Sequence, residues 1–203
     1  MQLPVVRLNP KADYRLRHGH LWIYSNEIDN AHYALTKLTV GDEVIIEDTK
    51  GKLLGVAYIN PNTLLCGRMI NPNQTTGLSL ELFISRTQRA LALREQLFEH
   101  GCYRLIYGDS DLLPGLVVDR FADLLVVQIS TAGMERHLAL ILQGLEQVLQ
   151  PQAIVVKNDG KMREMEGLES YITWHKGAER LTSELVENGV KFAISLSHGQ
   201  KTG

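Results

Sequence analysis

The chain has few cysteines, little net charge and no long apolar run, and each shortage excludes a class of protein. Its 203 residues hold 2 cysteines, which form no CxxC pair and have no histidine at metal spacing, so a disulfide framework and a zinc site are not indicated. The formal net charge of −2 gives no global basic field that would draw the chain to nucleic acid. No apolar run approaches the roughly 20 residues of a membrane span, and no leader pattern follows Met1. We therefore expect a cytoplasmic protein with no membrane partner.

The motifs that usually hold nucleotides, nucleophiles and metals are also missing. Neither GxGxxG nor GxxxxGK[ST] occurs, and GxSxG and HExxH are absent as well. The 7 histidines do not group with cysteine or with one another at a ligand spacing. Cys66, in an apolar run, and Cys102, after a predicted helix end, are expected to be structural. The motifs therefore assign no catalytic, cofactor-binding or metal-binding residue.

The first third of the chain reads as short strands separated by turn signals. Turn residues such as Asn, Asp, Gly and Pro separate four apolar runs, and one short helix is expected within residues 10–32. This spacing predicts a small β-barrel with strands at 3–8, 43–47, 53–59 and 64–70. Residues 71–77 contain no apolar side chain and indicate a linker. The first predicted domain therefore spans residues 1–72.

The middle of the chain alternates helical and strand patterns, which predicts a mixed α/β layer over residues 73–182. A long helix is expected over 78–100, with Phe83, Ala90, Leu93 and Leu97 on one apolar face. A second helix, over 134–149, follows the 3.6-residue period most closely and stops before Pro151. The expected strands are 103–107, 116–120, 124–130, 153–156 and 171–175.

The last 21 residues, 183–203, read as a hairpin followed by a loop. Asn188-Gly189 lies between alternating runs, and this dipeptide is a strong signal for a two-residue hairpin turn. Val190, Phe192, Ile194 and Leu196 would form one apolar face that needs a cover. A polar segment, Gly199-Gln200-Lys201-Thr202-Gly203, then looks like the beginning of a further domain. We interpret the chain as the front part of a larger protein.

Carboxylates and turn residues are concentrated in residues 108–121. Paired carboxylates there could perform acid/base chemistry. The alternative is structural: Asp109 and Asp111 sit in a predicted turn, where Asp caps its own backbone, and Asp119 could pair with Arg120. We favour the structural interpretation.

Basic and aromatic residues alternate between Arg15 and Tyr24. Proteins that bind RNA use this mixture, because cations contact phosphates while flat rings stack on unpaired bases. Arg15 and Arg17 could therefore face RNA. Alternatively, Trp22 is a core residue and the arginines are merely solvated, and these residues alone leave both interpretations open.

Three segments carry a family resemblance. Residues 16–25, LRHGHLWIYS, resemble the arginine-rich "RHPWVFS"-like opening of a PUA domain, although His20 and Leu21 stand where that family has a single Pro. Residues 103–121, from YRLIYGDSD to DRF, match a central-domain signature, and HGQKTG at 198–203 looks like the start of "GQKTGxxxDQR". The chain thus resembles bacterial class I SAM-dependent methyltransferases that form 5-methylcytosine in 23S rRNA.

This resemblance implies an α+β architecture. A PUA-like RNA-binding β-barrel would be followed by a central EEHEE-type α/β domain, then by a hairpin at the start of a Rossmann-like methyltransferase domain that is absent here. The family's cofactor loop and catalytic cysteine would lie beyond Gly203, so neither Cys66 nor Cys102 inherits the catalytic role. S-adenosylmethionine is the family's cofactor, and none is expected to bind this chain.

The resemblance also implies partners and contacts. The partner would be 23S rRNA, with Arg15, Arg17 and Arg68 at the RNA backbone and His18 stacking on a base. A homodimer is left open. The alternative function is a free-standing, non-catalytic RNA-binding module, and a pseudouridine synthase is a weaker third option because its catalytic Asp motif is not evident.

Overall fold

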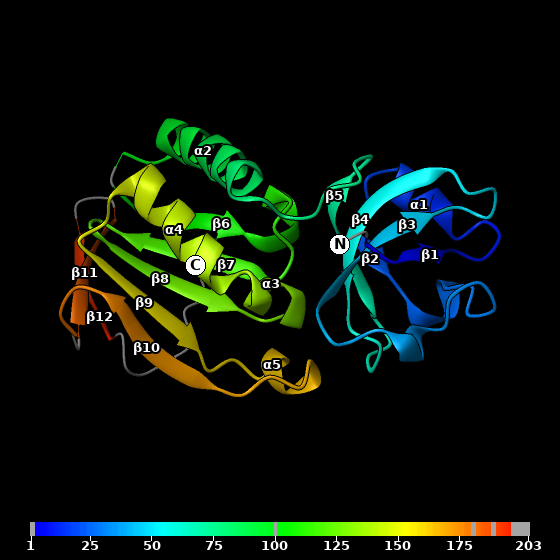
Figure 1. Ribbon diagram of the computed structural model, residues 1–203. Helices are drawn as coiled ribbons and strands as arrows, with labels where there is room; N and C mark the ends of the chain where they lie inside the picture. Colours follow the sequence, from blue (N-terminus) through cyan, green and yellow to red (C-terminus); the bar gives the residue numbers. More distant parts are fainter. Residues whose placement is uncertain (1–2, 100, 180–181, 188–189, 196–203) are drawn as a thin grey trace.

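The computed structural model describes residues 3–99, 101–179, 182–187 and 190–195, which form two domains and a hairpin (Figure 1). The N-terminal domain is a curled sheet of order β1-β3-β4-β5-β2, in which only β1 and β3 run parallel. Its elements are β1 (Val5–Arg7), α1 (Asp13–Arg17), β2 (Trp22–Ile23), β3 (Asp42–Glu47), β4 (Leu53–Ile59) and β5 (Gly67–Pro72).

Side-chain alternation explains why this sheet encloses a core. Along β3, Val44 and Ile46 are fully buried while Glu43 and Glu47 are not, as a period of two requires. Cys66 lies in the same core, which confirms its structural role, and burial raises the pKa of its thiol to about 12. The fourth predicted strand, over 64–70, begins later than expected, because Asn60 and Thr63 hold residues 60–65 in a loop with their own hydrogen bonds.

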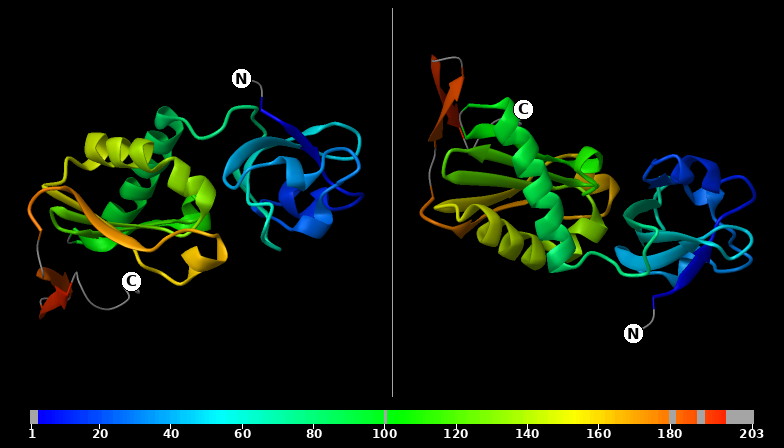
Figure 2. Two further views of the ribbon diagram at one scale, coloured as in Figure 1. Left: turned by 60° about the horizontal axis from the view of Figure 1, so that its bottom comes forward. Right: turned by 90° about the horizontal axis from the view of Figure 1, so that it is seen from above.

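The central domain is a second five-stranded sheet, of order β10-β9-β8-β7-β6, in which only β8 and β9 are parallel. Helices α2 and α4 pack together over one face of it, as Figure 2 shows. From β7 to β10 the order is two strands, the helices α3 and α4, a strand, the short helix α5 and a last strand, and α2 and β6 precede them. The elements are α2 (Leu80–Leu97), β6 (Cys102–Tyr107), β7 (Leu116–Phe121), β8 (Leu124–Ile129), α3 (Ala132–Arg136), α4 (Leu138–Leu149), β9 (Ala153–Asn158), α5 (Met162–Met165) and β10 (Tyr171–Lys176).

Two helix predictions need correction. Phe83 and Ala90 are buried as expected, but Leu93 and Leu97 are 50% and 67% exposed, so the last turns of α2 do not lie over the core. The predicted helix over 134–149 is interrupted at His137, whose backbone leaves the helical region at φ −97° and ψ 9°. There the His137 ring meets Glu43 of the N-terminal domain, so a contact between domains accompanies the break.

The two domains share one apolar core. Val56, Tyr58 and Ile70 of the N-terminal sheet belong to the same buried cluster as the central domain's core. Gly133 in α3 makes room for Tyr58, because a Cβ atom there would lie 2.1 Å from the tyrosine ring. From α2, Arg86 donates hydrogen bonds of 2.6 Å to the carbonyl oxygens of both Ile70 and Leu112. Burial lowers the pKa of Arg86 to about 10. The junction is therefore a packed and hydrogen-bonded interface.

A hairpin follows the central domain. Strands β11 (Thr182–Glu187) and β12 (Val190–Ser195) pair antiparallel, with Glu187 opposite Val190, as the predicted hairpin requires. The turn residues Asn188 and Gly189 and the segment 196–203 lie outside the described residues. Val190 and Phe192, on the predicted apolar face, are 52% and 49% exposed. No helix among the described residues has the length and apolar character needed to cross a membrane.

Candidate nucleic-acid interface

Helix α1 presents two of the predicted cations at the surface of the N-terminal domain. Arg15 lies 2.7 Å from Glu27, with its guanidinium 5.1 Å from the centre of the Tyr24 ring. Arg17 contacts Asp13 at 2.6 Å and Asp48 at 2.7 Å, and its pKa is raised, chiefly by the hydrogen bond to Asp13. Both arginine side chains keep about a third of their area exposed, at 37% and 34%. Their guanidinium groups are therefore oriented by acidic partners while remaining accessible.

The same helix carries an exposed pair of rings. The Tyr14 and His18 ring centres lie 4.3 Å apart, and Tyr14 is 66% exposed. His18 Nδ1 lies 2.7 Å from the Tyr14 carbonyl oxygen. A carbonyl can only accept, so Nδ1 carries the proton of this bond and Nε2 is the nitrogen left for another partner. Sequence reasoning selected His18 but missed Tyr14, although the four-residue spacing on one helix was a usable signal.

Asp48 joins α1 to the turn between β3 and β4. Its Oδ2 accepts a hydrogen bond from Arg17, while Oδ1 accepts from the backbone N–H groups of Lys50 and Lys52. The bond from the Lys52 N–H is the largest contribution to the lowered pKa of this carboxyl group. The side chains of Lys50 and Lys52 are exposed. The Asp48 carboxylate therefore holds Arg17 beside a turn that carries two exposed lysines.

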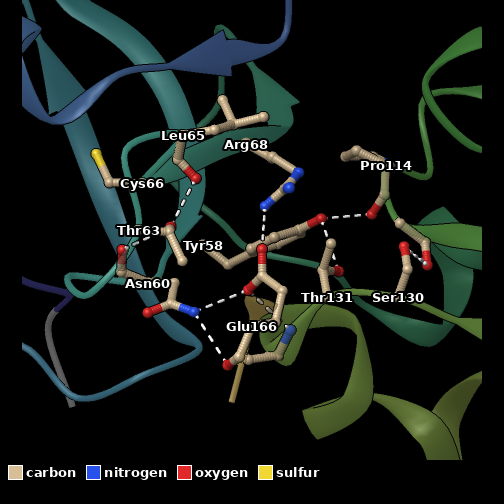
Figure 3. A network of polar contacts seen from close by, with 12 residues as sticks. Tyr58, Asn60, Thr63, Leu65, Cys66, Arg68, Pro114, Ser130, Thr131 and Glu166 are labelled. Atoms are coloured by element: carbon tan, nitrogen blue, oxygen red, sulfur yellow. Dashed lines mark hydrogen bonds and ion pairs between the residues drawn. The ribbon is translucent and has the colours of Figure 1, made fainter. Parts of the chain in front are cut away.

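Arg68 lies in a different environment. Its guanidinium is 2.8 Å from Glu166, and the two side chains are only 12% and 5% exposed. Glu166 also accepts a 2.9 Å hydrogen bond from Asn60, so both residues belong to the polar network of the domain junction in Figure 3. The structure does not bring Arg68 together with Arg15, Arg17 and His18.

The same network includes Tyr58. Its hydroxyl donates to the Pro114 carbonyl oxygen and accepts from Thr131 Oγ1 at 3.1 Å (Figure 3). The side chain is buried, and desolvation raises the pKa of the phenol above its ordinary value. Figure 3 therefore shows an interface in which buried polar atoms of one domain are satisfied by the other.

The carboxylates of residues 108–121 have structural partners, with one difference from the prediction. Asp111 accepts two bonds from Arg94, at 2.8 and 2.7 Å, which confirms its structural role. Asp119 pairs with Arg104 at 2.8 Å, so the predicted pair with Arg120 is wrong. Consecutive residues of a strand point to opposite faces, which keeps the side chains of Asp119 and Arg120 apart.

Trp22 is not a core residue, contrary to one of the two sequence interpretations. Its side chain is 42% exposed, and Nε1 donates a 3.1 Å hydrogen bond to Asp109 of the central domain. Asp109 lies in the short turn Gly108–Asp111 that directly follows Tyr107, and Tyr107 is 56% exposed. An exposed aromatic residue of each domain therefore borders this turn.

Two observations on the described residues concern metals and cofactors. Within them, no three His, Cys, Asp or Glu side chains group as metal ligands would. A depression of about 500 Å³ on α4 is lined by residues that include Leu138, Leu142, Glu146 and His175. It has no glycine-rich turn at a strand end, where an adenosyl cofactor would be held, so its residues do not fit S-adenosylmethionine.

Comparison with known proteins identifies relatives for the whole chain. Residues 6–72 match a family model described as a PUA-like domain. The chain is 33% identical over 202 residues to ribosomal RNA large subunit methyltransferase I of Pseudoalteromonas translucida, covering 98% of this chain and 50% of that protein. The enzyme of the same name from Tolumonas auensis is 32% identical over 203 residues, with the same coverages. That of Escherichia coli is 30% identical over 194 residues, covering 93% and 48%.

Solved structures agree at the level of the fold. A Streptococcus mutans protein provisionally described as a SAM-dependent methyltransferase superposes with a TM-score of 0.78 at 19% identity, over 97% of this chain and 50% of its own. A second structure, of a provisionally assigned methyltransferase in complex with SAH, gives 0.77 at 19% identity, over 98% and 49%. The chain is thus homologous to large-subunit rRNA methyltransferases and spans about half their length.

Proposed function

We propose that this chain is the RNA-recognition portion of a SAM-dependent methyltransferase that forms 5-methylcytosine in 23S rRNA. The observation that carries the proposal is homology to large-subunit rRNA methyltransferases along 98% of the chain. The PUA-like match over residues 6–72 and the cation-rich surface of α1 support a role in binding RNA. In this proposal S-adenosylmethionine serves the complete protein.

In this proposal α1 contacts the RNA. Arg15 and Arg17 bind backbone phosphates, exchanging the partly buried carboxylates of Glu27 and Asp13 for phosphate oxygens. His18, beside Tyr14, stacks on an unpaired base. Lys50 and Lys52 extend the phosphate-binding surface, because Asp48 holds their turn against Arg17. Arg68 is left out of this contact set because Glu166 occupies its guanidinium in the domain junction.

The test compares the salt dependence of binding to deproteinised 23S rRNA for the parent chain and for an Arg15→Ala/Arg17→Ala variant. Each lost phosphate contact should reduce the slope of log affinity against log salt by about 0.7 to 0.9, so the double variant should lose roughly 1.5. An Arg89→Ala/Lys161→Ala variant removes two exposed positive charges elsewhere and should keep the parent slope. If both variants bind like the parent at every salt concentration, α1 is not the RNA-binding surface.

The catalytic part of the proposal needs a separate measurement. The intact mass of the native protein, compared with 22.8 kDa for this chain, tests whether further sequence accompanies it in the cell. Nucleoside analysis of 23S rRNA from cells with and without the gene then tests the product. Loss of one 5-methylcytosine supports the proposal, whereas unchanged 5-methylcytosine with loss of another methylated nucleoside assigns a different product.

A further inference from the structure

We infer that the junction of the two domains is a second RNA-binding site, in which Trp22 and Tyr107 stack on unpaired bases of a single strand. This inference rests on the proposed function, because it assumes that the chain binds RNA. It adds a contact that only the assembled pair of domains can provide. The chemical class of the ligand is single-stranded RNA, and base-paired RNA is excluded because its stacked bases hide their faces.

The position of the two aromatic residues is the first support. Trp22 belongs to the N-terminal sheet and Tyr107 to the end of β6, yet both border the turn Gly108–Asp111. The indole is attached to that turn by the bond from Trp22 Nε1 to Asp109. Single residues of this size are commonly exposed on proteins, but here an exposed ring of each domain flanks the same four residues.

The orientation of the rings is the second support. The hydrogen bond to Asp109 restricts the rotation of the Trp22 side chain, and the guanidinium of Arg104 lies 5.3 Å from the centre of the Tyr107 ring. Both rings are therefore held in place before a ligand arrives, which lowers the entropy lost when a base stacks on them. They remain 42% and 56% exposed, so area is left for a ligand.

The charges around the rings are mixed, because Asp109 and Asp111 lie in the turn itself and two arginines flank it. Arg68 is the direct neighbour of Trp22 across β2 and β5, and Arg104 lies beside Tyr107. Each arginine is paired with a carboxylate, Glu166 or Asp119, so the arginines position the site more than they attract RNA to it. Attraction would come from α1, which ends five residues before Trp22 along the chain. A single strand of RNA could thus extend from the arginines of α1 to the rings of Trp22 and Tyr107.

The experiment uses Trp22 as its own reporter. Trp174 is the other tryptophan of the 203-residue chain, so a Trp174→Phe variant emits from Trp22 alone. We titrate it with a single-stranded oligoribonucleotide of about 12 nucleotides, within the range that such sites cover, and with the same sequence annealed to its complement. The single strand should quench Trp22 emission on binding, and the duplex should not.

Tyr107 variants measured in the same background complete the test. Tyr107→Leu removes the flat ring and should weaken binding about tenfold, as loss of one stacked base does, whereas Tyr107→Phe should bind like the parent. Leu97→Ala, which trims another exposed apolar side chain, is the matched control and should also bind like the parent.

The outcomes separate this inference from the proposed function. If the single strand binds in a salt-dependent manner that Arg15→Ala/Arg17→Ala abolishes, but Trp22 emission is unchanged at saturation, the junction site is refuted and the proposed function stands. Quenching of Trp22 with full affinity in Tyr107→Leu also refutes it, because the site would then lie in one domain. If no RNA binds at any salt concentration, both the inference and the proposed function fall.

Discussion

Arginine serves two different purposes in this molecule, and the contrast between α1 and the domain junction shows why. Arg15 is 37% exposed beside Glu27, whereas Arg68 is 12% exposed beside Glu166. Water screens the first pair and competes for it, so that pair holds an accessible cation without contributing much stability. The second pair is shielded from water, so the loss of either partner would leave the other charge buried and unpaired. The same residue type is therefore available to a ligand in one region and committed to structure in the other.

Breaking the junction pair should give the largest effect. Glu166→Ala leaves Arg68 in the interface without its acceptor, while Asn60 keeps only its bond to the backbone carbonyl of residue 166. We expect the free energy of unfolding to fall by about 3 kcal/mol, as for other broken buried pairs. Urea unfolding measures the loss. The control is Glu47→Ala, which removes the partner of the more exposed Arg7 and should cost less than about 1 kcal/mol. Equal losses in the two variants would mean that burial does not distinguish the two regions.

Acid should weaken the junction through Glu43. Burial raises the pKa of this carboxyl group, but hydrogen bonds from His137 and from the Leu78 N–H outweigh it, so the folded pKa lies below the ordinary value. The resulting stability is present above the unfolded pKa and is lost as pH falls through the folded pKa. Glu43→Gln should therefore destabilise the protein by about 1 kcal/mol at pH 6 and by less at pH 3. Urea unfolding at both pH values measures this, and a difference that does not change with pH would contradict the assignment.

The smallest effect is expected at α1. Arg15→Ala should lower the free energy of unfolding by less than about 1 kcal/mol, because its pair with Glu27 is partly exposed. The loss should shrink further in 1 M salt, where screening acts over about 3 Å. Thermal unfolding at low and high salt provides the measurement. A loss as large as that of Glu166→Ala would show that α1 is a structural element and that Arg15 and Arg68 serve the same purpose.

Local patterns predicted most of the strands, because each depends on neighbours in sequence. The alternation in residues 43–47 and the turn at Asp48 were sufficient to locate β3 and β4. The failures depend on contacts between distant residues. Arg68 meets Glu166 98 residues away, His137 meets Glu43 94 residues away, and Trp22 meets Asp109 87 residues away.

The candidate site likewise combines features set by neighbours in sequence with contacts between distant residues. Arg15, Arg17 and His18 share one short helix, so their proximity could be read from sequence. The place of Lys50 and Lys52 beside them could not, because it depends on a bond that Arg17 donates to Asp48, 31 residues away. No local rule indicates which of several acidic residues a given arginine will meet.

The space left by Gly133 has a consequence for the relative orientation of the two domains. The Tyr58 ring fills that space, and a side chain at position 133 would collide with it. This contact therefore favours one relative orientation of the two sheets. The separation between α1 and the sheet of the central domain is therefore set by the protein and not by what it binds. A ligand that contacts both domains would therefore meet them at a fixed offset.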